Sequence, residues 1–257
     1  MLTVVPIPAF NDNYIWMLHN RRHAAVIDPG DAGPVLDTLA QNALTLAAIL
    51  CTHHHGDHVA GVCKLAQVYN VPVYGPRHED VPCVSHPVGE SDTVEIPELG
   101  IRLGVLDIPG HTLGHVAYTG TGNLFCGDTL FGCGCGRLFE GTAAQLFDSL
   151  QRLVSLPDET KVYCAHEYTE ANIRFALACE PGNGQLHKRG DESRALRAAG
   201  LPTVPSTLAL EKATNPFLRC TSPEIIRNVE LQQAIHLPPG NGAAVFAALR
   251  EWRNNFG

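Results

Sequence analysis

The chain has 257 residues, and its proportions of 45% hydrophobic and 17% charged residues fit a globular protein of one large domain or two unequal ones. The formal net charge of −8 argues against a general binder of nucleic acid, because such proteins present a basic face. No apolar stretch approaches the ~20 residues that a membrane-spanning helix needs, so we also expect no membrane partner.

The N-terminal part alternates strand-like segments with turns. Strands are expected at residues 2–7, 14–18 and 24–28. Pro34 is placed as a first-turn proline and predicts a short helix to about Asn42. The apolar run 46–51 has the length and flanks of a buried strand.

A histidine-rich stretch follows this buried strand. Residues 52–58 hold four histidines and one aspartate, and the apolar spacing of residues 59–69 predicts a helix directly afterwards. The histidines are therefore expected on a tight loop at a strand end, where open sheets usually place ligands. Imidazoles and a carboxylate are good ligands for zinc or a similar first-row ion. The stretch predicts a metal site rather than a solvated loop or a tag.

Three later strand ends carry the same residue types. Strands are predicted at residues 101–108, 123–126 and 161–164, and they are followed by His111, Asp128 and His166 respectively. Each alone would pass as a turn, but four such strand ends together predict a metal centre. His115 is expected only to hold its loop together. His78 and His86 fall in a predicted surface loop over residues 75–95.

The candidate ligands are His53, His55, Asp57, His58, His111, Asp128 and His166. One ion needs three or four protein ligands, so seven candidates suggest a pair of ions about 3.5–4 Å apart. Two ions that share Asp128 and a water would lower the pKa of that water, and the second ion could polarise a carbonyl. This is machinery for hydrolysis without a protein nucleophile.

The remaining elements give the chain a helical C-terminal part. The glycine-rich residues 132–137 lack the Gly-Lys-Ser/Thr ending of a phosphate-binding loop. Thr142 and Gln145 form a capping box before a helix that ends at Pro157. After a polar link over residues 180–190, the pattern stays helical. The C-terminal helices are expected at residues 171–178, 191–199, 207–213, 223–233 and 243–252.

The cysteines and the N-terminus bear on the cellular compartment. Nine cysteines are an odd number without CxxC pairs, and we expect most of them to be buried reduced thiols. Residues 1–6 lack a basic segment followed by a long apolar core, so no secretory signal is expected. Together these features predict a cytoplasmic protein.

The motifs resemble those of the metallo-β-lactamase superfamily and, within it, of the glyoxalase II (hydroxyacylglutathione hydrolase) family. The resemblance begins with His53-x-His55-x-Asp57-His58, Gly110-His111, Gly127-Asp128 and the late His166. Further matching motifs follow the family's order over nearly the whole chain, at residues 10–14, 26–31, 127–131, 134–142, 164–169 and 215–219.

The resemblance implies an α/β fold, an αββα sandwich of two mixed sheets over residues 1–170, and a smaller C-terminal all-α domain over residues 171–257 that covers the site. It implies two divalent metal ions, with zinc as the first choice and iron or manganese as alternatives. One ion would take His53, His55 and His111, the other Asp57, His58 and His166, with Asp128 between them. His54 would point away from both ions.

The implied reaction is hydrolysis of a glutathione thioester. S-D-lactoylglutathione would yield D-lactate and glutathione, the last step of methylglyoxal detoxification, by attack of a metal-bridging hydroxide with Asp57 as the catalytic residue. Arg137, Phe139, Tyr168 and Arg219 match positions that hold the glutathione moiety. Phe139 replaces a tyrosine of some members, which forfeits one hydrogen bond of ~0.5–1.5 kcal/mol. A monomer is expected.

Three alternatives remain open. A lactonase of the same superfamily would share the metal ligands but would not need Arg137, Tyr168 or the helical tail. A sulfur dioxygenase with one iron would not need the second ligand set. A metal-binding or storage module would explain the ligands but neither the glutathione-type motifs nor the second domain.

Overall fold

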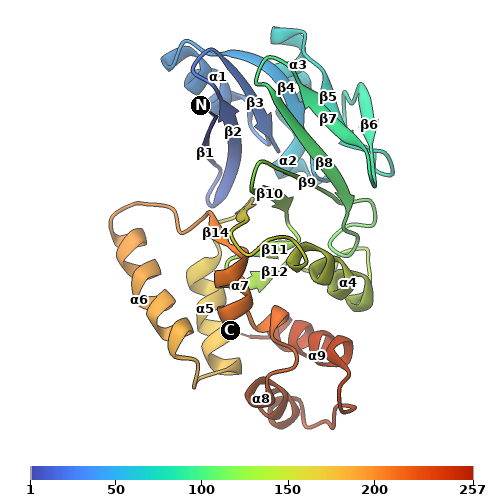
Figure 1. Ribbon diagram of the computed structural model, residues 1–257, viewed down its shortest axis with the longest axis vertical. Helices are drawn as coiled ribbons and strands as arrows, with labels where there is room; N and C mark the ends of the chain where they lie inside the picture. Colours follow the sequence, from blue (N-terminus) through green and yellow to red (C-terminus); the bar gives the residue numbers. More distant parts are fainter. Residues whose placement is uncertain (1, 257) are drawn as a thin grey trace.

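The computed structural model describes residues 2–256 (Figure 1). Two six-stranded sheets form its centre, with the strand orders β1-β2-β3-β4-β5-β6 and β14-β13-β10-β9-β8-β7. Both sheets are mixed, because β1 to β3 pair antiparallel while β3 to β6 pair parallel, and β10 pairs parallel with β13 in an otherwise antiparallel second sheet. The predicted α/β sandwich of two mixed sheets is confirmed.

The strands are short, as in most twisted sheets. The first sheet contains β1 (Thr3–Ala9), β2 (Asn13–His19), β3 (His23–Ile27), β4 (Thr45–Leu50), β5 (Val73–Pro76) and β6 (His86–Val88). The second contains β7 (Thr93–Ile96), β8 (Ile101–Asp107), β9 (Val116–Gly120), β10 (Asn123–Gly127), β13 (Lys161–Cys164) and β14 (Ser206–Thr207). A separate two-stranded ribbon is formed by β11 (Leu130–Phe131) and β12 (Gly134–Cys135).

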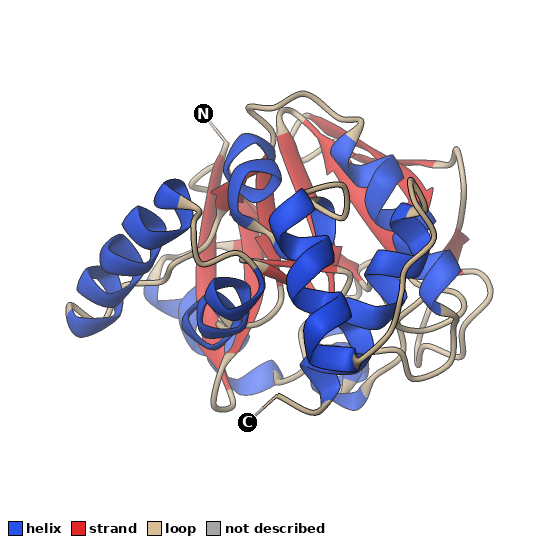
Figure 2. Cartoon of the chain, turned by 90° about the horizontal axis from the view of Figure 1, so that it is seen from below, coloured by secondary structure: helices blue, strands red, loops and turns tan. Residues whose placement is uncertain are grey.

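The helices surround the strands in Figure 2. The part of the chain before β13 contributes α1 (Ala32–Gln41), α2 (Gly56–Val59), α3 (Val62–Tyr69) and α4 (Ala143–Val154). The C-terminal part contributes α5 (Thr169–Cys179), α6 (Gly184–Ala198), α7 (Leu208–Thr214), the 3-10 turn η1 (Pro216–Leu218), α8 (Pro223–Gln233) and α9 (Gly242–Asn254).

The alternation of side chains along the first sheet explains its two covered faces. In β2, Tyr14, Trp16 and Leu18 belong to the core between the sheets. Ile15 and Met17 point to the opposite face and belong to a second core, which also contains the buried residues of α1 and α3. Because successive strand residues point to opposite faces, a run of apolar residues in β2 buries both.

The C-terminal helices support the glycine-rich loop between β11 and α4. Glu211 of α7 is fully buried, and its carboxylate accepts a hydrogen bond from the backbone N–H of Cys133 and pairs with Arg189 of α6 at 2.5 Å. Asn215 donates to the carbonyls of Phe131 and Gly134. Because Glu211 contacts both the cation of Arg189 and a backbone N–H of the loop, the buried ion pair fixes the loop to the helical part.

Four expectations from the sequence need correction. Residues 75–95 are not all loop, since they contain β6 and the first three residues of β7. The predicted helix over residues 59–69 is broken before α3, because the N–H of Gly61 donates to the carbonyl of Pro29 instead of continuing the turn. The link over residues 180–190 is shorter than predicted, because Asn183 caps α6. The C-terminal part is not entirely helical, because it contributes the short strand β14, which pairs with β13 in the second sheet.

The cysteines mostly follow the prediction. Seven are free and buried, whereas Cys63 and Cys83 form a disulfide between α3 and the segment after β5. None of the helices in residues 2–256 combines the length and hydropathy needed to cross a bilayer.

Candidate metal centre

The structure brings all seven predicted ligand residues together. They come from the ends of β4, β8, β10 and β13 and from the short helix α2 that begins right after the first histidines. Three overlapping groups have ligand atoms within 4.8 Å of one another: His53 with His55 and His111; His53 with His58 and Asp128; and Asp57 with His58 and His166.

The first group consists of three imidazoles. Nδ1 of His55 lies 3.1 Å from Nε2 of His53 and 3.1 Å from Nε2 of His111. Two ligand atoms of a tetrahedral zinc site are separated by about 3.3 Å when each lies ~2.0–2.1 Å from the ion. The spacing of these nitrogens therefore fits a shared ion.

The group of Asp57, His58 and His166 adds a carboxylate. Oδ2 of Asp57 lies 3.5 Å from Nε2 of His58 and 3.5 Å from Nε2 of His166. Asp128 lies between the two groups. Its Oδ1 faces Nε2 of His58 at 3.5 Å and Nε2 of His166 at 3.3 Å, and its Oδ2 faces Nε2 of His111 at 3.5 Å. One carboxylate thus reaches both sets of ligands.

The burial and charge of these groups also fit divalent ions. Within residues 2–256, Nε2 of His58 and Oδ1 of Asp128 are buried without a hydrogen-bond partner. Burial holds the pKa of His53 well below its usual value, which leaves a neutral imidazole. Burial would raise the pKa of Asp128, but His58 and His166 hold it well below its usual value. Neutral imidazole and ionised carboxylate are the forms that bind metal.

Each of four histidines has its outer ring nitrogen fixed by a second partner. Nδ1 of His53 lies 3.0 Å from Oγ1 of Thr52, Nδ1 of His58 lies 3.1 Å from Asp28, Nδ1 of His111 lies 2.7 Å from the carbonyl of Arg137, and Nδ1 of His166 lies 2.7 Å from Asp12. Such partners orient the inner nitrogen toward an ion. Asp12 and Asp28 lie in segments that matched the family's motifs, at residues 10–14 and 26–31, but the sequence reasoning assigned neither residue a role.

A glycine allows Asp128 to enter the cluster. Gly127 has φ +47°, a conformation that favours glycine, and a Cβ atom there would lie 2.3 Å from Oγ1 of Thr52 and 2.8 Å from Nε2 of His115. The buried His115 accepts a hydrogen bond from the N–H of Asp128, and its ring stacks on His53. It therefore supports the loop, as predicted.

His54 points away from the cluster. Its Nδ1 lies 2.9 Å from Glu79, and its Nε2 lies 3.3 Å from Glu140. Glu79 also accepts hydrogen bonds from Thr112 and Gly114, so one buried carboxylate joins the loop of His53 to the loop of His111. The sequence contained no signal for this role of Glu79.

A cavity of about 300 Å³ opens beside the cluster. It is lined by His111, Asp128, Phe131, Cys135, Arg137, Phe139, Tyr168, Asn172, Arg250 and Arg253. Phe139 is 61% exposed and packs edge-on against His55 and His111. The ring of Tyr168 stacks on His166. Burial raises the pKa of the Tyr168 hydroxyl, and the negative charge of Asp12 raises it further. Arg137, Phe139 and Tyr168 thus lie where a substrate would meet the cluster.

Arg219 does not line this cavity. Its guanidinium binds the carboxylate of Glu180 through Nε at 2.7 Å and Nη2 at 2.8 Å, and it also donates to the carbonyl of Lys212. Its charge and its planar donors are therefore already engaged by the protein. The expectation that Arg219 holds the substrate stays a prediction, and the contact that the structure shows for its guanidinium is the pair with Glu180. Arg250 and Arg253, which the sequence reasoning did not single out, line the cavity instead.

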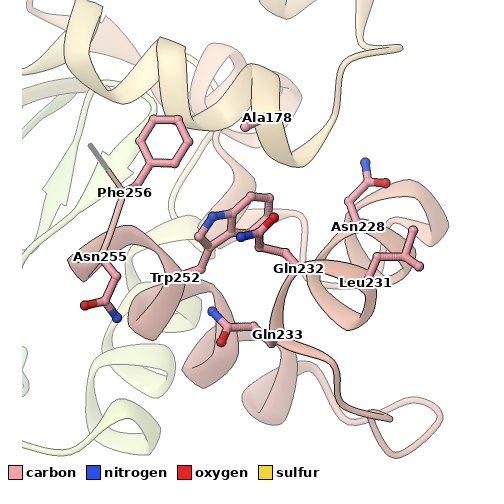
Figure 3. A pocket seen from close by; sticks show the side chains of 8 residues that line it. All are labelled: Ala178, Asn228, Leu231, Gln232, Gln233, Trp252, Asn255 and Phe256. Carbon is pink, nitrogen blue, oxygen red and sulfur yellow. The ribbon is translucent and has the colours of Figure 1, made fainter.

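A larger cavity of about 640 Å³ lies between α5, α8 and α9 (Figure 3). Its lining residues are Ala178, Asn228, Leu231, Gln232, Gln233, Trp252, Asn255 and Phe256. None of these side chains carries a charge or can act as an acid, a base or a strong metal ligand at neutral pH. This larger cavity therefore offers no catalytic group, in contrast to the cavity beside the cluster.

Comparison with known proteins agrees with this geometry. Residues 10–166 match the metallo-beta-lactamase superfamily, and residues 167–256 match the hydroxyacylglutathione hydrolase C-terminus. The chain is 55% identical over 256 residues to the hydroxyacylglutathione hydrolase of Nitrosomonas europaea, covering all of this chain and 97% of that protein. Among solved structures, ETHE1 from Myxococcus xanthus is 26% identical with a TM-score of 0.65 and covers both chains fully. TTHA1623, solved in a di-iron-bound form, is 26% identical with a TM-score of 0.59 and covers 84% of this chain and 100% of its own.

The fold and the histidine-aspartate cluster place the chain in the metallo-β-lactamase superfamily. The C-terminal match and the full-length relatives narrow this assignment. The chain belongs to the hydroxyacylglutathione hydrolase (glyoxalase II) family of hydrolases. The predicted family is thereby confirmed.

Proposed function

We propose that the chain hydrolyses S-2-hydroxyacylglutathiones, with S-D-lactoylglutathione as the principal substrate, to glutathione and the free 2-hydroxy acid. One observation carries this proposal: a single cavity joins Asp128 and His111 of the cluster to the cationic Arg137 and to Tyr168. If the thioester carbonyl lies at the cluster, the anionic glutathione moiety would extend along the side of the cavity that carries Arg137 and Tyr168. The naming of the full-length relatives supports the same substrate.

The donor set favours two divalent ions, and we propose zinc, with iron or manganese as alternatives that the same ligands accept. His53, His55 and His111 would hold the first ion, and Asp57, His58 and His166 the second, with Asp128 shared. When bound, such ions lower the pKa of water and polarise the thioester carbonyl.

The side chains orient the reactants. Asn13 donates to Oδ2 of Asp57 at 3.0 Å, which fixes the carboxylate. Asp57 is the most exposed carboxylate of the cluster, with a side chain that is 42% exposed, so we assign it the catalytic role of accepting the hydrogen bond of the attacking water. The hydroxyl of Tyr168 stays protonated and can donate to the glutathione backbone. Because a thiolate is a good leaving group, no side chain has to protonate it.

The decisive experiment is hydrolysis of S-D-lactoylglutathione, followed as loss of thioester absorbance, with metal content measured on the same sample. Turnover with close to two ions per chain supports the proposal. Turnover of lactones but not of the thioester would favour a lactonase. One iron per chain with oxygen uptake would favour a sulfur dioxygenase, but the second ligand group of Asp57, His58 and His166 argues against it.

We also propose the division into a catalytic domain, residues 1–170, and a helical substrate domain, residues 171–257, in a monomeric, cytoplasmic protein. Seven of the nine cysteines are free and buried, which supports a reducing compartment, whereas the Cys63–Cys83 disulfide is the one feature that argues for an oxidising one. Large exposed hydrophobic side chains are scattered, with Val68 on α3, Leu201 in the connection after α6 and Leu231 on α8, which supports a monomer. Light scattering and cell fractionation test these two points.

A further inference from the structure

One disulfide joins two segments that flank the metal centre. Cys63 lies in α3, which begins four residues after His58, and Cys83 lies in the segment between β5 and β6. The other seven cysteines are free and buried. The disulfide differs from them in accessibility, because Cys83 is exposed and Cys63 is half-buried. A small molecule in solution therefore reaches this pair more readily than any other cysteine of the chain.

The backbone at Cys83 has a conformation that residues other than glycine rarely adopt. Its φ is +62°, in the left-handed region, and it follows Pro82 in a turn. Turns that place a left-handed residue after a proline usually have glycine there, because a Cβ atom makes this conformation unfavourable. The disulfide is a covalent restraint on this turn, so opening the bond allows the backbone at Cys83 to relax.

Few other contacts hold the turn in place. Within residues 2–256, no group of residues 80–84 makes a hydrogen bond, and the nearest hydrogen bonds along the chain belong to Glu79 and Ser85. The apolar contacts are those of Val81, which is 6% exposed, and of Val84 at the edge of the core around α1 and α3. A segment with so few hydrogen bonds opens readily unless it is cross-linked. The disulfide is the covalent cross-link of residues 80–84.

Glu79 lies directly before this turn and connects it to the metal centre. Its carboxylate is 3% exposed and accepts hydrogen bonds from the N–H of His54 at 2.6 Å, from the N–H of Gly114 at 3.0 Å and from the hydroxyl of Thr112. His54 stands between two of the proposed metal ligands, and Thr112 directly follows a third. A displacement of Glu79 would therefore release both loops that carry the three-histidine group.

We propose that Cys83 is a site of thiol–disulfide exchange with a small thiol such as glutathione, and that opening the disulfide weakens metal retention through Glu79. The small thiolate attacks Sγ of Cys83, the S–S bond breaks, and Cys63 leaves as a thiolate that takes a proton from water. A second small thiolate attacks the mixed disulfide, which leaves Cys83 as a thiol and releases the disulfide of the small thiol. Two small thiols are oxidised and one protein disulfide is reduced. The exchange does not depend on the proposed hydrolysis, since any small thiol can carry it out.

The first measurement follows the exchange itself on the zinc-loaded chain. Wild type is incubated without oxygen in excess reduced glutathione near neutral pH and then alkylated, and the labelled cysteines are identified by mass spectrometry of peptides. We expect Cys63 and Cys83 to become labelled while the seven buried thiols stay unlabelled, and early quenching should trap glutathione on Cys83. A disulfide that stays closed under these conditions, or glutathione trapped on Cys63 instead, would overturn the exchange at Cys83.

The second measurement tests the connection to the metal centre. Zinc affinity is determined by competition with a chromogenic chelator, before and after reduction with a phosphine that is removed by gel filtration. We expect the dissociation constant for zinc to rise about 10-fold on reduction, as for the loss of a residue that orients metal ligands. The Cys63→Ser/Cys83→Ser variant should have the weakened affinity without reductant and show no further change with it. It thus controls for effects of the phosphine on the other cysteines. Unchanged zinc affinity in reduced wild type would overturn the connection.

A double-mutant cycle tests whether Glu79 carries the effect. In Glu79→Gln the carboxylate that joins the two loops is already lost, so reduction should change zinc affinity less than about twofold. Circular dichroism of each protein establishes that the fold is intact. A further loss of about 10-fold on reduction of Glu79→Gln would show that the disulfide acts by another route and would refute the part assigned to Glu79. None of these measurements uses a substrate, so a failure of the proposed thioester hydrolysis would leave them unaffected.

Discussion

Asp128 directs its Oδ1 at Nε2 of His166 over 3.3 Å, while its other carboxylate oxygen faces the three-histidine group through His111. The Asp128 side chain is 10% exposed, and Oδ1 has no hydrogen-bond partner in residues 2–256. An ionised oxygen in such a position is costly unless a cation compensates it. Asp128 therefore contacts both ligand groups, the three histidines through His111 and the Asp57 group through His58 and His166.

Asp128→Ala should lose metal and hydrolysis together. Removing the shared ligand leaves each ion with one protein ligand fewer, so we expect fewer than two ions per chain and a fall in kcat/KM of at least about 100-fold. Metal analysis and thioester hydrolysis on one preparation measure both. Asp148→Asn on the exposed side of α4 is the control and should change neither. Full activity with two retained ions would refute the shared position.

Glu79→Gln should lower the metal affinity of the group of His53, His55 and His111, although Glu79 itself contacts none of these three histidines. The carboxylate is 3% exposed, accepts from the N–H of His54 at 2.6 Å and of Gly114 at 3.0 Å, and thereby joins the two loops that carry His53 and His111. Loss of such a support typically lowers metal affinity about 10- to 100-fold. Competition with a chromogenic chelator measures this affinity.

The control for Glu79→Gln is Glu98→Gln, which neutralises an exposed carboxylate in the β7–β8 turn. Metal affinity should be unchanged in this control. If Glu79→Gln retains its ions as tightly as wild type, the two loops hold their positions without Glu79, and its role would be limited to the fold.

The sequence predicted the ligands well because ligand loops at strand ends are local features. His53, His111, Asp128 and His166 each follow a predicted strand, and those strands are present within one or two residues. The supporting residues could not be predicted in the same way. Asp28 reaches His58 across 30 positions, and Asp12 reaches His166 across 154. Such contacts depend on tertiary packing, which the spacing of residues along the sequence does not reveal.

The cavity wall shows the same limit. Arg219 lies in a motif that resembled a substrate-binding segment, yet the structure pairs it with Glu180. Arg250 lies in the stretch predicted only as the last helix, residues 243–252, and Arg253 follows that stretch directly. The packing of α9 against α4 carries them to the cavity, and nothing in their own spacing indicates that arrangement.

Arg219→Ala should lower stability rather than substrate affinity. Glu180 would keep its hydrogen bonds from Ser222 and Asn183 but lose its cation, which should cost about 1–3 kcal/mol of unfolding free energy. KM for S-D-lactoylglutathione should change less than about twofold. Urea unfolding and steady-state kinetics measure the two quantities. A large rise in KM with unchanged stability would restore Arg219 as a substrate contact.

The stabilising effect of Glu180 should disappear in acid. Burial would raise the pKa of Glu180, but hydrogen bonds from Arg219, Ser222 and Asn183 lower it from 4.5 to about 2. Because folding favours the ionised form, its contribution is fully present above pH 4.5 and declines as the pH falls toward 2. Wild type should exceed Glu180→Gln in unfolding free energy by about 1–3 kcal/mol at neutral pH and by progressively less in acid.

Urea unfolding of both proteins from about pH 7 to about pH 3 measures this difference. Both carry the same metal-ligand residues, so loss of metal in acid affects them alike and cancels in the comparison. Glu95→Gln is the matched control, because Glu95 pairs with Arg102 at 3.0 Å on the exposed surface and should show little effect at any pH. A gap between wild type and Glu180→Gln that stays constant over the whole range would show that the carboxylate charge does not stabilise the helical part.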